Sequence, residues 1–468
     1  MEKQETTFAL FFTNRTFMPG ELILEARKEM AESLEKAGYK YIMMDESATR
    51  FGGIETRDEG RLYHDWLASH KGEYDGVILC MPIFADENGA AEALKDADAP
   101  ILLQAYPDEI GKMDFAHRRD AFCGKFSVSD TFTQYGIHFT MLEPHVVHPS
   151  SEKWQENLHE FAAICRVVKG MKRFSLGCIG ARTTAFKTTR FDEIALEKLG
   201  ITVESIDLSD LIFKVQNLKD DDDKVIAKKA ALNAYSDFSN VPEFNFSNLA
   251  KISVVIDDYI ETYHLSAITL RCWTELQTIL RVAPCVLLGE LNNRGIPASC
   301  EIDLCSAITM RALSLATGVP AACVDWNNNY GEEEDKAILF HCGPIATSLM
   351  TDKGCVTAHK MFEKTDPGSG WGCCEGRIAA FPATYSNCQT KDGKLIVYTM
   401  EGRQTDDPIE PSYFGCAGVT EIPALQRKLV KLGKNGFKHH TTFSKGNVKA
   451  ALDEAFSNYL GYTVVDID

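Results

Sequence analysis

The sequence predicts an α/β protein in which two doubly wound parallel-sheet domains are followed by a C-terminal β-rich, barrel-like domain. Residues 1–170 alternate short apolar runs with amphipathic stretches, a pattern typical of an open parallel sheet covered by helices. The same alternation returns over residues 171–330. Across residues 331–468, short β-like runs are separated by Gly, Pro, Asp and Asn, which favours a mostly antiparallel domain.

The first region contains four predicted strands. The buried run TFALFFT predicts a strand over residues 7–13, and helical spacing of apolar residues predicts a helix over 21–40 that stops at Ala37-Gly38. Further apolar runs predict strands at 41–46, 75–82 and 99–107. Helical stretches between these strands favour parallel pairing, since parallel strands need long crossover connections.

The second region repeats this pattern. Apolar runs predict strands at 173–180, 201–208, 267–273 and 284–293, and helices are predicted at 191–200 and 300–317. The four consecutive aspartates within 217–230 are interpreted as the solvated start of a helix, because they lack the alternating ligands and the glycine of a calcium loop.

The third region is predicted to be built from strands at 337–344, 376–386 and 394–403, with a closing helix at 447–461. The adjacent pair Cys373-Cys374 does not have the spacing of a CxxC motif, so it is predicted to pack in a glycine-rich turn.

Composition excludes several partners. The formal net charge of −18 argues against a nucleic-acid scaffold and against an anionic membrane surface, although an anionic substrate stays possible in a local basic pocket. The fifteen cysteines have no repeated spacing, and the sequence shows no secretory signal and no apolar run long enough for a membrane span. We therefore expect a cytoplasmic protein whose cysteines act mostly as small core residues.

Common nucleotide and hydrolase signatures are missing, since the sequence contains no P-loop, no dinucleotide fingerprint and no GxSxG elbow. Three other segments carry polar residues at the ends of apolar runs. Glu301 opens a predicted helix, Asp325 ends the run AACVD, His341 ends AILFH, and the pair His439-His440 precedes a Thr-rich strand. Two acids with one or two imidazoles form a ligand set suited to Mn²⁺, Fe²⁺ or Co²⁺.

Each of these residues also has an ordinary structural interpretation. Glu301 is compatible with a favourable helix N-terminus, and Asp325 with a turn. A histidine in an apolar strand, such as His341, is commonly a satisfied core residue. Of the pair His439-His440 only one side chain is expected to point inward, because neighbouring strand residues face opposite ways.

Taken together, these segments resemble the L-fucose isomerase and L-arabinose isomerase superfamily of metal-dependent aldose–ketose isomerases. Glu301 in CEIDL matches the first carboxylate ligand, and Asp325 in VDWNN, 24 residues later, matches the second. His440 in KHHTTFS matches the second histidine of an HHT motif, and His341 in LFHCG aligns with a further histidine ligand of the arabinose branch. The resemblance implies two doubly wound domains, a β-rich C-terminal domain, and a trimer or hexamer with shared active sites.

The resemblance also implies a mechanism. A divalent metal, Mn²⁺ or else Co²⁺, Fe²⁺ or Mg²⁺, acts as a Lewis acid on the carbonyl while a proton moves between adjacent carbons through an enediolate. Glu301 and Asp325 are predicted to ligate the metal and to serve as the acid/base pair, and His440 to complete the ligand set. His341 is a fourth candidate ligand.

The sugar is less closely specified. Loops that follow parallel strands are where open α/β sheets bind ligands, so polar residues there are candidates for substrate binding. Substrates similar to L-fucose or L-arabinose, or an anionic hexose such as sulfoquinovose, are compatible with these residues. A non-catalytic sugar-binding or sensor protein, and another metal-dependent enzyme such as an aldolase or epimerase, are the alternatives. The candidate substrate residues are Arg15, Arg182, Lys187, Trp273, Glu275 and Gln277.

Overall fold

The computed structural model describes residues 5–468 and divides them into two compact units. The N-terminal unit comprises the described residues up to Lys169 together with Glu454–Leu460, and the C-terminal unit comprises Gly170–Asp453 together with Gly461–Asp468. The division at residues 170 and 330 that the sequence suggests stays a prediction. Among the described residues, no helix combines the length and the apolar composition that crossing a membrane requires.

The N-terminal unit contains a four-stranded parallel sheet in the order β2-β1-β3-β4. Its strands lie at the positions that the sequence predicts, and the predicted helix α1 ends at Gly38, whose φ of 79° is left-handed. The elements are β1 (Thr7–Phe12), α1 (Leu22–Ala37), β2 (Lys40–Met43), α2 (Arg57–Ser69), β3 (Gly76–Met81), α3 (Glu87–Leu94), β4 (Ile101–Ala105), α4 (Ala121–Tyr135) and α5 (Glu152–Met171), with short 3-10 turns at Glu46–Ala48 and Arg50–Gly52.

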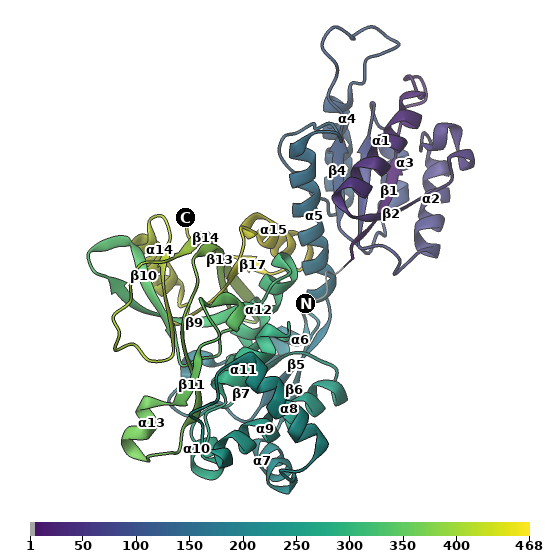
Figure 1. Ribbon diagram of the computed structural model, residues 1–468. Helices are drawn as coiled ribbons and strands as arrows, with labels where there is room; N and C mark the ends of the chain where they lie inside the picture. The colour runs from purple at the N-terminus through teal and green to yellow at the C-terminus, as the bar shows by residue number, and fades with distance from the viewer. Residues whose placement is uncertain (1–4) are drawn as a thin grey trace. The chain divides into compact units, whose positions relative to one another are not determined.

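Helices cover both faces of this sheet, as expected for a doubly wound domain (Figure 1). Phe8 and Phe11 lie three residues apart on β1 and therefore face opposite sides. The ring of Phe8 stacks on Phe161 of α5 at 5.6 Å between centroids, and that of Phe11 contacts Tyr63 of α2 at 4.6 Å. The predicted doubly wound architecture is confirmed.

The C-terminal unit begins with a second parallel sheet, in the order β6-β5-β7-β8. Three of its four strands match predicted ones. The elements are β5 (Phe174–Ile179), a 3-10 turn (Lys187–Thr189), α6 (Glu193–Glu197), β6 (Ile201–Ile206), α7 (Leu208–Asn217), α8 (Asp223–Tyr235), α9 (Glu243–Thr262), β7 (Leu265–Leu270), α10 (Glu275–Leu280), α11 (Cys285–Asn293), β8 (Ala298–Cys300) and α12 (Leu304–Thr317).

The strand predicted at 284–293 is wrong, because this segment forms helix α11. Pro284 occupies the N-cap position of α11, and the helix is buried from Cys285 to Asn292. A short run that is buried on all sides has no polar face, so its apolar residues cannot distinguish a helix from a strand. The fourth strand of the sheet is instead the three-residue β8, which precedes Glu301.

The last part of the C-terminal unit is a closed antiparallel barrel. Within the described residues, β15 pairs with both β10 and β14, which closes the ring β15-β10-β9-β16-β13-β14. The predicted barrel-like domain is therefore confirmed. The elements are β9 (Ala321–Tyr330), β10 (Glu333–His341), a 3-10 turn (Thr347–Leu349), β11 (Cys355–Ala358), α13 (Lys360–Thr365), β12 (Trp371–Arg377), β13 (Phe381–Lys391), β14 (Lys394–Thr405), β15 (Cys416–Glu421), α14 (Leu425–Asn435), β16 (His440–Lys445), α15 (Lys449–Glu454) and β17 (Thr463–Val464). The π-helical turn Ala455–Tyr459, between the last two, belongs to the N-terminal unit.

Two details of this part concern the cysteines. Cys373 and Cys374 lie in strand β12, so their predicted place in a glycine-rich turn is wrong. Gly372, which precedes Cys373, permits close backbone packing, since a Cβ on Gly372 would lie 1.9 Å from the Ala283 carbonyl oxygen. All fifteen cysteines lie within the described residues and are free thiols, and all except Cys123 and Cys355 are buried, which confirms the expected core role.

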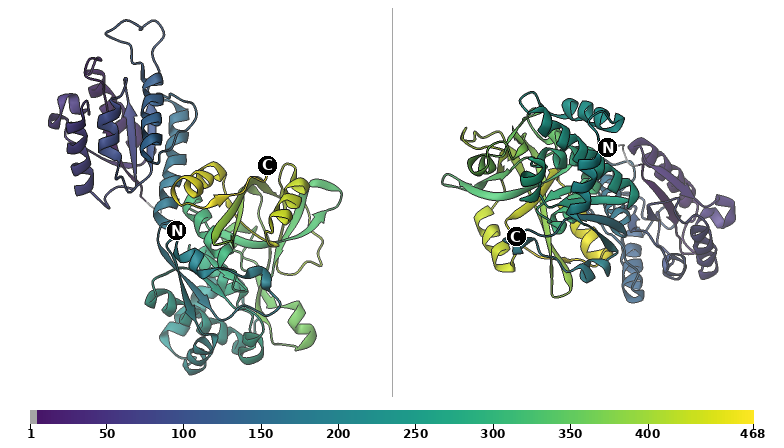
Figure 2. Two further views of the ribbon diagram at one scale, coloured as in Figure 1. Left: turned by 180° about the vertical axis from the view of Figure 1, so that it is seen from behind. Right: turned by 90° about the horizontal axis from the view of Figure 1, so that it is seen from below.

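Helix α12 joins the second sheet to the barrel. It contacts β7 and β8 on one side and β9, β13 and β16 on the other. Both views of Figure 2 show the green and yellow barrel packed against the teal elements of the second sheet. The residues at the start of α12 therefore lie where the sheet meets the barrel.

Candidate active site

Glu301 lies at the carboxyl end of β8, in a turn that leads into α12. Glu301 and Ile302 both have left-handed backbones, with φ of 64° and 61°. Such conformations cost free energy for residues with a side chain and are maintained by the surrounding contacts. Here the Glu301 N–H donates to the Leu270 carbonyl at 3.0 Å, and the Thr189 hydroxyl donates to the Glu301 carbonyl at 3.2 Å. These contacts direct the carboxylate toward the barrel.

Three barrel strands supply the other predicted ligands. Asp325 of β9 and His440, the first residue of β16, are direct cross-strand partners. His341 is the last residue of β10, and its neighbour Phe340 pairs with Asp325. The structure therefore brings together all four residues that the sequence predicts as ligands, although they come from four different elements.

His440 Nε2 faces two carboxylates. It lies 3.1 Å from Glu301 Oε2 and 3.4 Å from Asp325 Oδ1. None of these three buried atoms has a hydrogen-bond partner. Buried polar atoms are nearly always hydrogen-bonded, so three that converge in this way form a place that could hold a cation.

A buried carboxylate orients His440 from its other side. The His440 Nδ1–H donates to Asp303 Oδ2 at 2.6 Å, which leaves Nε2 to face Glu301 and Asp325. Asp303 also accepts from Lys438 Nζ at 2.5 Å and caps α12 by accepting from the Ser306 N–H. A carboxylate that fixes the tautomer of a ligating histidine is the usual outer partner of a metal site.

The electrostatics of the site favour a positive charge at this place. Burial opposes protonation of His440, but Cys323, Asp303 and Glu301 raise its pKa well above the ordinary value. Burial alone would raise the pKa of Glu301, yet His440, His341 and His439 together lower it. The Asp303 carboxylate is buried, and Lys438 and His440 hold its pKa below the ordinary range.

The three atoms without partners fit a divalent cation. In an octahedral site with metal–ligand distances of about 2.1 Å, neighbouring ligand atoms lie about 3.0 Å apart, close to the two measured separations. Two carboxylate oxygens and one imidazole suit Mn²⁺, Fe²⁺, Co²⁺ or Mg²⁺. Glu301, Asp325 and His440 are therefore the residues that could hold such an ion.

His341 lies against this group but has a different hydrogen bond. Its Nδ1 accepts the Cys342 N–H at 2.9 Å, so a neutral His341 carries its proton on Nε2. Burial opposes protonation of this ring, but Cys342, Asp325 and Glu301 raise the pKa of His341 to about 9. The ligand atoms of Glu301, His341 and His440 all lie within 4.8 Å of one another, and the predicted ligand role of His341 stays a prediction.

The loop that follows β5 carries two of the predicted substrate residues. Thr189 of this loop anchors it to Glu301, and the ring of Phe186 lies 6.3 Å from that of His439. Lys187 is exposed, whereas Arg182 is half-buried and donates to the Thr183 carbonyl at 3.4 Å. The segment 181–191 contains no acidic residue, so its cations are not neutralised within the loop.

Three more lie beyond β7, Trp273 in the loop that follows the strand and Glu275 and Gln277 in α10. Trp273 contacts Phe186 at 5.2 Å between ring centroids, which joins the two loops. Glu275 forms a two-pronged ion pair with Arg271, at 2.7 and 2.8 Å. Gln277 is buried, and its Oε1 has no hydrogen-bond partner. Near them, a cavity of about 690 Å³ opens at the carboxyl ends of β5, β6 and β7, lined by residues that include Gly180, Asp207, Arg271 and Glu275.

Arg15 is the one predicted site residue that belongs to the N-terminal unit. It follows β1 and pairs with Glu87 at 2.6 Å. Its guanidinium also lies 4.0 Å from the centroid of the Phe84 ring. Within its own unit, Arg15 therefore has a structural ion-pair partner.

Sequence reasoning missed several residues that position the site. These residues are Asp303, Lys438 and Thr189. Sequence reasoning also assigned no role to His439, whose Nε2 lies 3.6 Å from Asp325 Oδ1 although its side chain is 42% exposed. His440 points inward as expected, but His439 precedes β16 and is not bound by strand alternation. For Asp303 a signal existed, since an aspartate before a helix is a typical N-cap.

Comparison with known proteins agrees with this geometry. The family described as fucose/sulfoquinovose isomerase, N-terminal domain, matches residues 9–172, and the family described as L-fucose isomerase, C-terminal domain, matches residues 339–468. The chain belongs to the fucose isomerase superfamily. The predicted membership of this superfamily is thereby confirmed, and the superfamily consists of enzymes that interconvert aldoses and ketoses.

Individual relatives are more distant. The chain is 26% identical over 307 residues to a sulfoquinovose isomerase of Clostridium sp. (strain MSTE9), and this alignment covers 65% of this chain and 67% of that protein. It is 24% identical over 399 residues to a sulfoquinovose isomerase of Priestia aryabhattai, covering 83% and 85%. A solved periplasmic solute-binding protein of an ABC transporter from Actinobacillus succinogenes 130z, with bound D-allose, aligns at 12% identity over 67% of this chain and 93% of its own; its TM-score of 0.18 carries no argument.

Proposed function

We propose that this member of the superfamily is a divalent-metal-dependent isomerase that converts a sulfonated aldohexose, sulfoquinovose, to the corresponding ketose. The observation that carries the metal is the convergence of Glu301 Oε2, Asp325 Oδ1 and His440 Nε2, three buried atoms without hydrogen-bond partners. The substrate is supported by the relatives named sulfoquinovose isomerase and by the unneutralised cations of the loop that follows β5.

The proposed residues divide the chemistry among them. When bound, a divalent cation such as Mn²⁺ supplies Lewis-acid polarisation of the sugar carbonyl. Glu301 and Asp325 act as the acid/base pair through an enediolate. One takes the proton from C2 of the aldose and returns it to C1, and the other protonates O1 and takes the proton of the C2 hydroxyl, so that no net proton is gained or lost. Asp303 keeps the Nδ1 proton of His440 in place, so that Nε2 stays available as a ligand.

Recognition of the sulfonate follows from charge and position. Arg182 and Lys187 lie on the loop that contains Thr189, and the Thr189 hydroxyl donates to the Glu301 carbonyl. This hydrogen bond attaches the loop and its cations to the backbone of a proposed metal ligand. Trp273 and Phe186 form an aromatic contact beside them. An apolar ring face with cations at one end suits a hexose that carries an anionic C6.

The test compares sulfoquinovose with D-glucose, which has a hydroxyl in place of the sulfonate, and with L-fucose and L-arabinose, all in Mn²⁺. Formation of ketose and exchange of the C2 hydrogen with D₂O are followed by NMR. We expect turnover of sulfoquinovose with kcat/KM at least about 100-fold above that for D-glucose, since two charge-assisted contacts are lost with the neutral sugar. Formation of an epimer or of cleavage products, or no conversion of any aldose, would refute the proposal.

Variants locate the sulfonate site. Lys187→Ala and Arg182→Ala should raise KM for sulfoquinovose without changing turnover of any neutral sugar. Lys198→Ala is the matched control, because Lys198 is an exposed lysine of the same unit at the C-cap of α6. If Lys198→Ala changes KM as much as Lys187→Ala does, only general surface charge is involved.

The assembly is part of the same proposal. We infer that the chain works in the cytoplasm as a homo-oligomer, a trimer or hexamer with shared active sites, and binds neither nucleic acid nor membrane. The support for an oligomer is a set of exposed apolar side chains on the N-terminal unit, of the kind found at protein–protein contacts. Sedimentation of the purified chain tests this, and a monomer would contradict it. The side chains are Ile110, Met113, Phe115, Phe122 and Phe126.

A further inference from the structure

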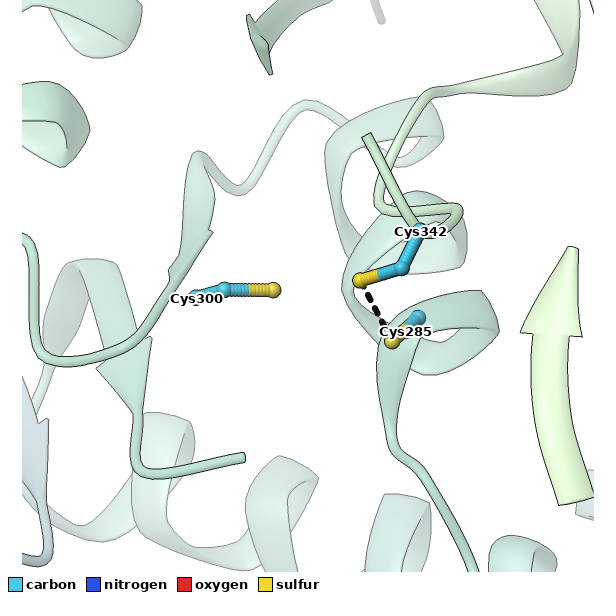
Figure 3. Close-up of side chains that lie close together, drawn as sticks. All are labelled: Cys285, Cys300 and Cys342. Carbon is cyan, nitrogen blue, oxygen red and sulfur yellow. Dashed lines mark hydrogen bonds between the residues drawn. The ribbon is translucent and has the colours of Figure 1, made fainter. Parts of the chain in front are cut away.

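A cluster of buried thiols lies next to the candidate active site. The Sγ atoms of Cys285, Cys300 and Cys342 lie within 4.8 Å of one another, and those of Cys285 and Cys342 are 3.2 Å apart. Figure 3 shows the Cys300 thiol pointing from β8 toward the other two, which come from the start of α11 and from the residue after β10. All three residues are buried.

A fourth thiol adjoins this group. Cys272, which follows β7, hydrogen-bonds Cys300 through its side chain. A fifth, Cys373 of β12, packs against Cys285 and Cys342 and donates to the Cys342 carbonyl at 2.5 Å. The cluster thus offers three converging sulfur atoms and a fourth thiol next to Cys300.

We propose that Cys285, Cys300 and Cys342 form a binding site for a thiophilic cation, Zn²⁺ in the first place, with Cys272 as the fourth ligand. In a tetrahedral zinc site with Zn–S distances of about 2.3 Å, the sulfur atoms lie about 3.8 Å apart. The separations in the cluster, from 3.2 Å to at most 4.8 Å, bracket this value. Each thiol that binds releases its proton to solvent, and no group changes oxidation state.

The two neighbouring sites differ in the metals they select. Glu301, Asp325 and His440 offer oxygen and nitrogen, which suit Mn²⁺, Mg²⁺ or Co²⁺, whereas the thiol cluster offers only sulfur, which suits Zn²⁺. Residues of the two sites are adjacent in the sequence, because Cys300 precedes Glu301 and Cys342 follows His341. One chain could therefore hold two different metals without exchange between the sites.

The position of the cluster indicates a structural role. Its three thiols tie together α11, β8 and the end of β10, and so link the second sheet to the barrel. Bound metal contributes its binding free energy to folding. It would also hold the left-handed turn at Glu301 from the side opposite Thr189.

Cobalt tests the site by spectroscopy. The thiol-reduced protein is stripped of metal, loaded with Co²⁺ and examined for the thiolate-to-cobalt charge-transfer band in the near ultraviolet. We expect one band-forming equivalent of Co²⁺ per chain, displaced by Zn²⁺. The band should be retained in Glu301→Gln, which alters only the oxygen-and-nitrogen site, and in Cys165→Ala, a buried thiol of the N-terminal unit. It should be lost in Cys285→Ala.

Native mass spectrometry of the unaltered chain keeps the proposal testable if Cys285→Ala fails to fold. Addition of Zn²⁺ should increase the mass by one zinc less the protons of the ligating thiols, and this zinc should protect Cys285 and Cys342 from alkylation. Absence of the charge-transfer band, alkylation unchanged by Zn²⁺, or a Cys285–Cys342 disulfide in protein purified without reductant would each overturn it. Because none of these readouts measures isomerisation, failure here leaves the proposed function standing.

Discussion

The two parallel sheets have the same strand order but very different carboxyl edges. Both place their first strand second in the sheet, as β2-β1-β3-β4 and β6-β5-β7-β8. Each edge carries one buried glutamate, Glu55 beyond β1 and Glu301 beyond β8, and each of these residues is 6% exposed. The surroundings of the two carboxylates decide what each can do.

Glu55 is satisfied by protein groups. One oxygen accepts from Asn14 Nδ2 at 2.5 Å, and the other lies 3.4 Å from Arg50 Nε. Burial is the strongest influence on it and raises its pKa. Glu301 faces His440, one of its oxygens has no hydrogen bond, and the histidines lower its pKa despite burial. The first edge is complete by itself, whereas the second offers the ligand atoms for the cation that we propose.

The largest expected effect comes from replacing each buried glutamate, in separate variants, by glutamine. Glu301→Gln should lower kcat/KM by about 10²- to 10⁴-fold, because it removes both a ligand and a member of the acid/base pair. Glu55→Gln should leave kcat/KM unchanged, since a glutamine oxygen can still accept from Asn14. Initial rates and bound Mn²⁺ by plasma mass spectrometry measure the difference. Equal losses in the two variants would mean that the edges do not differ in function.

How much of the fold and of the site the sequence predicts depends on how far apart the interacting residues lie along the chain. Seven of the eight strands of the two sheets contain enough apolar residues to be predicted locally. The three-residue β8 and the helix α11 could not be, because β8 is too short and α11 is buried all round. Glu301, Asp325 and His440 could be proposed because each interrupts or ends an apolar run. Asp303 could not be paired with Lys438 or His440, which lie 135 and 137 residues away in the sequence.

The next largest effect concerns the carboxylate behind His440. Asp303→Asn leaves Lys438 buried without its counter-charge, so we expect a loss of about 3–5 kcal/mol in the free energy of unfolding. The affinity for Mn²⁺ should fall about 10- to 100-fold, because His440 loses its orienting carboxylate. Urea unfolding of the metal-free protein and titration with Mn²⁺ measure the two effects separately.

A double variant distinguishes the two roles of Asp303. In Asp303→Asn with Lys438→Met, no charge is left buried without a partner, so most of the lost stability should return. The Mn²⁺ affinity should stay low, because the orienting carboxylate is still missing. If affinity returns together with stability, Asp303 acts only through folding and does not position His440.

The smallest expected effect concerns Lys125, a buried lysine of the N-terminal unit that can be compared with Lys438 of the C-terminal unit. Lys125 of α4 is 2% exposed and donates to the His145 carbonyl at 2.7 Å. Burial lowers its pKa from 10.5 to about 8, whereas Lys438, paired with Asp303, has its pKa raised although burial opposes this. A lysine whose folded-state pKa is lowered destabilises the fold fully below pH 8, where both states are protonated. The cost disappears as the pH rises from about 8 toward 10.5.

Lys125→Met should therefore stabilise the N-terminal unit at pH 7, by at most about 3 kcal/mol, and the gain should vanish above pH 10.5. Lys438→Met should instead destabilise the C-terminal unit, because Asp303 then stays buried without its cation. Hydrogen exchange of the amides of β1–β4 and of β5–β8, at pH 7 and pH 10, reports on each unit separately. A stabilisation by Lys125→Met that is the same at both pH values would show that its amino group keeps an ordinary pKa in the fold. The contrast between a self-sufficient first unit and a charge-dependent second unit would then rest on the two glutamates alone.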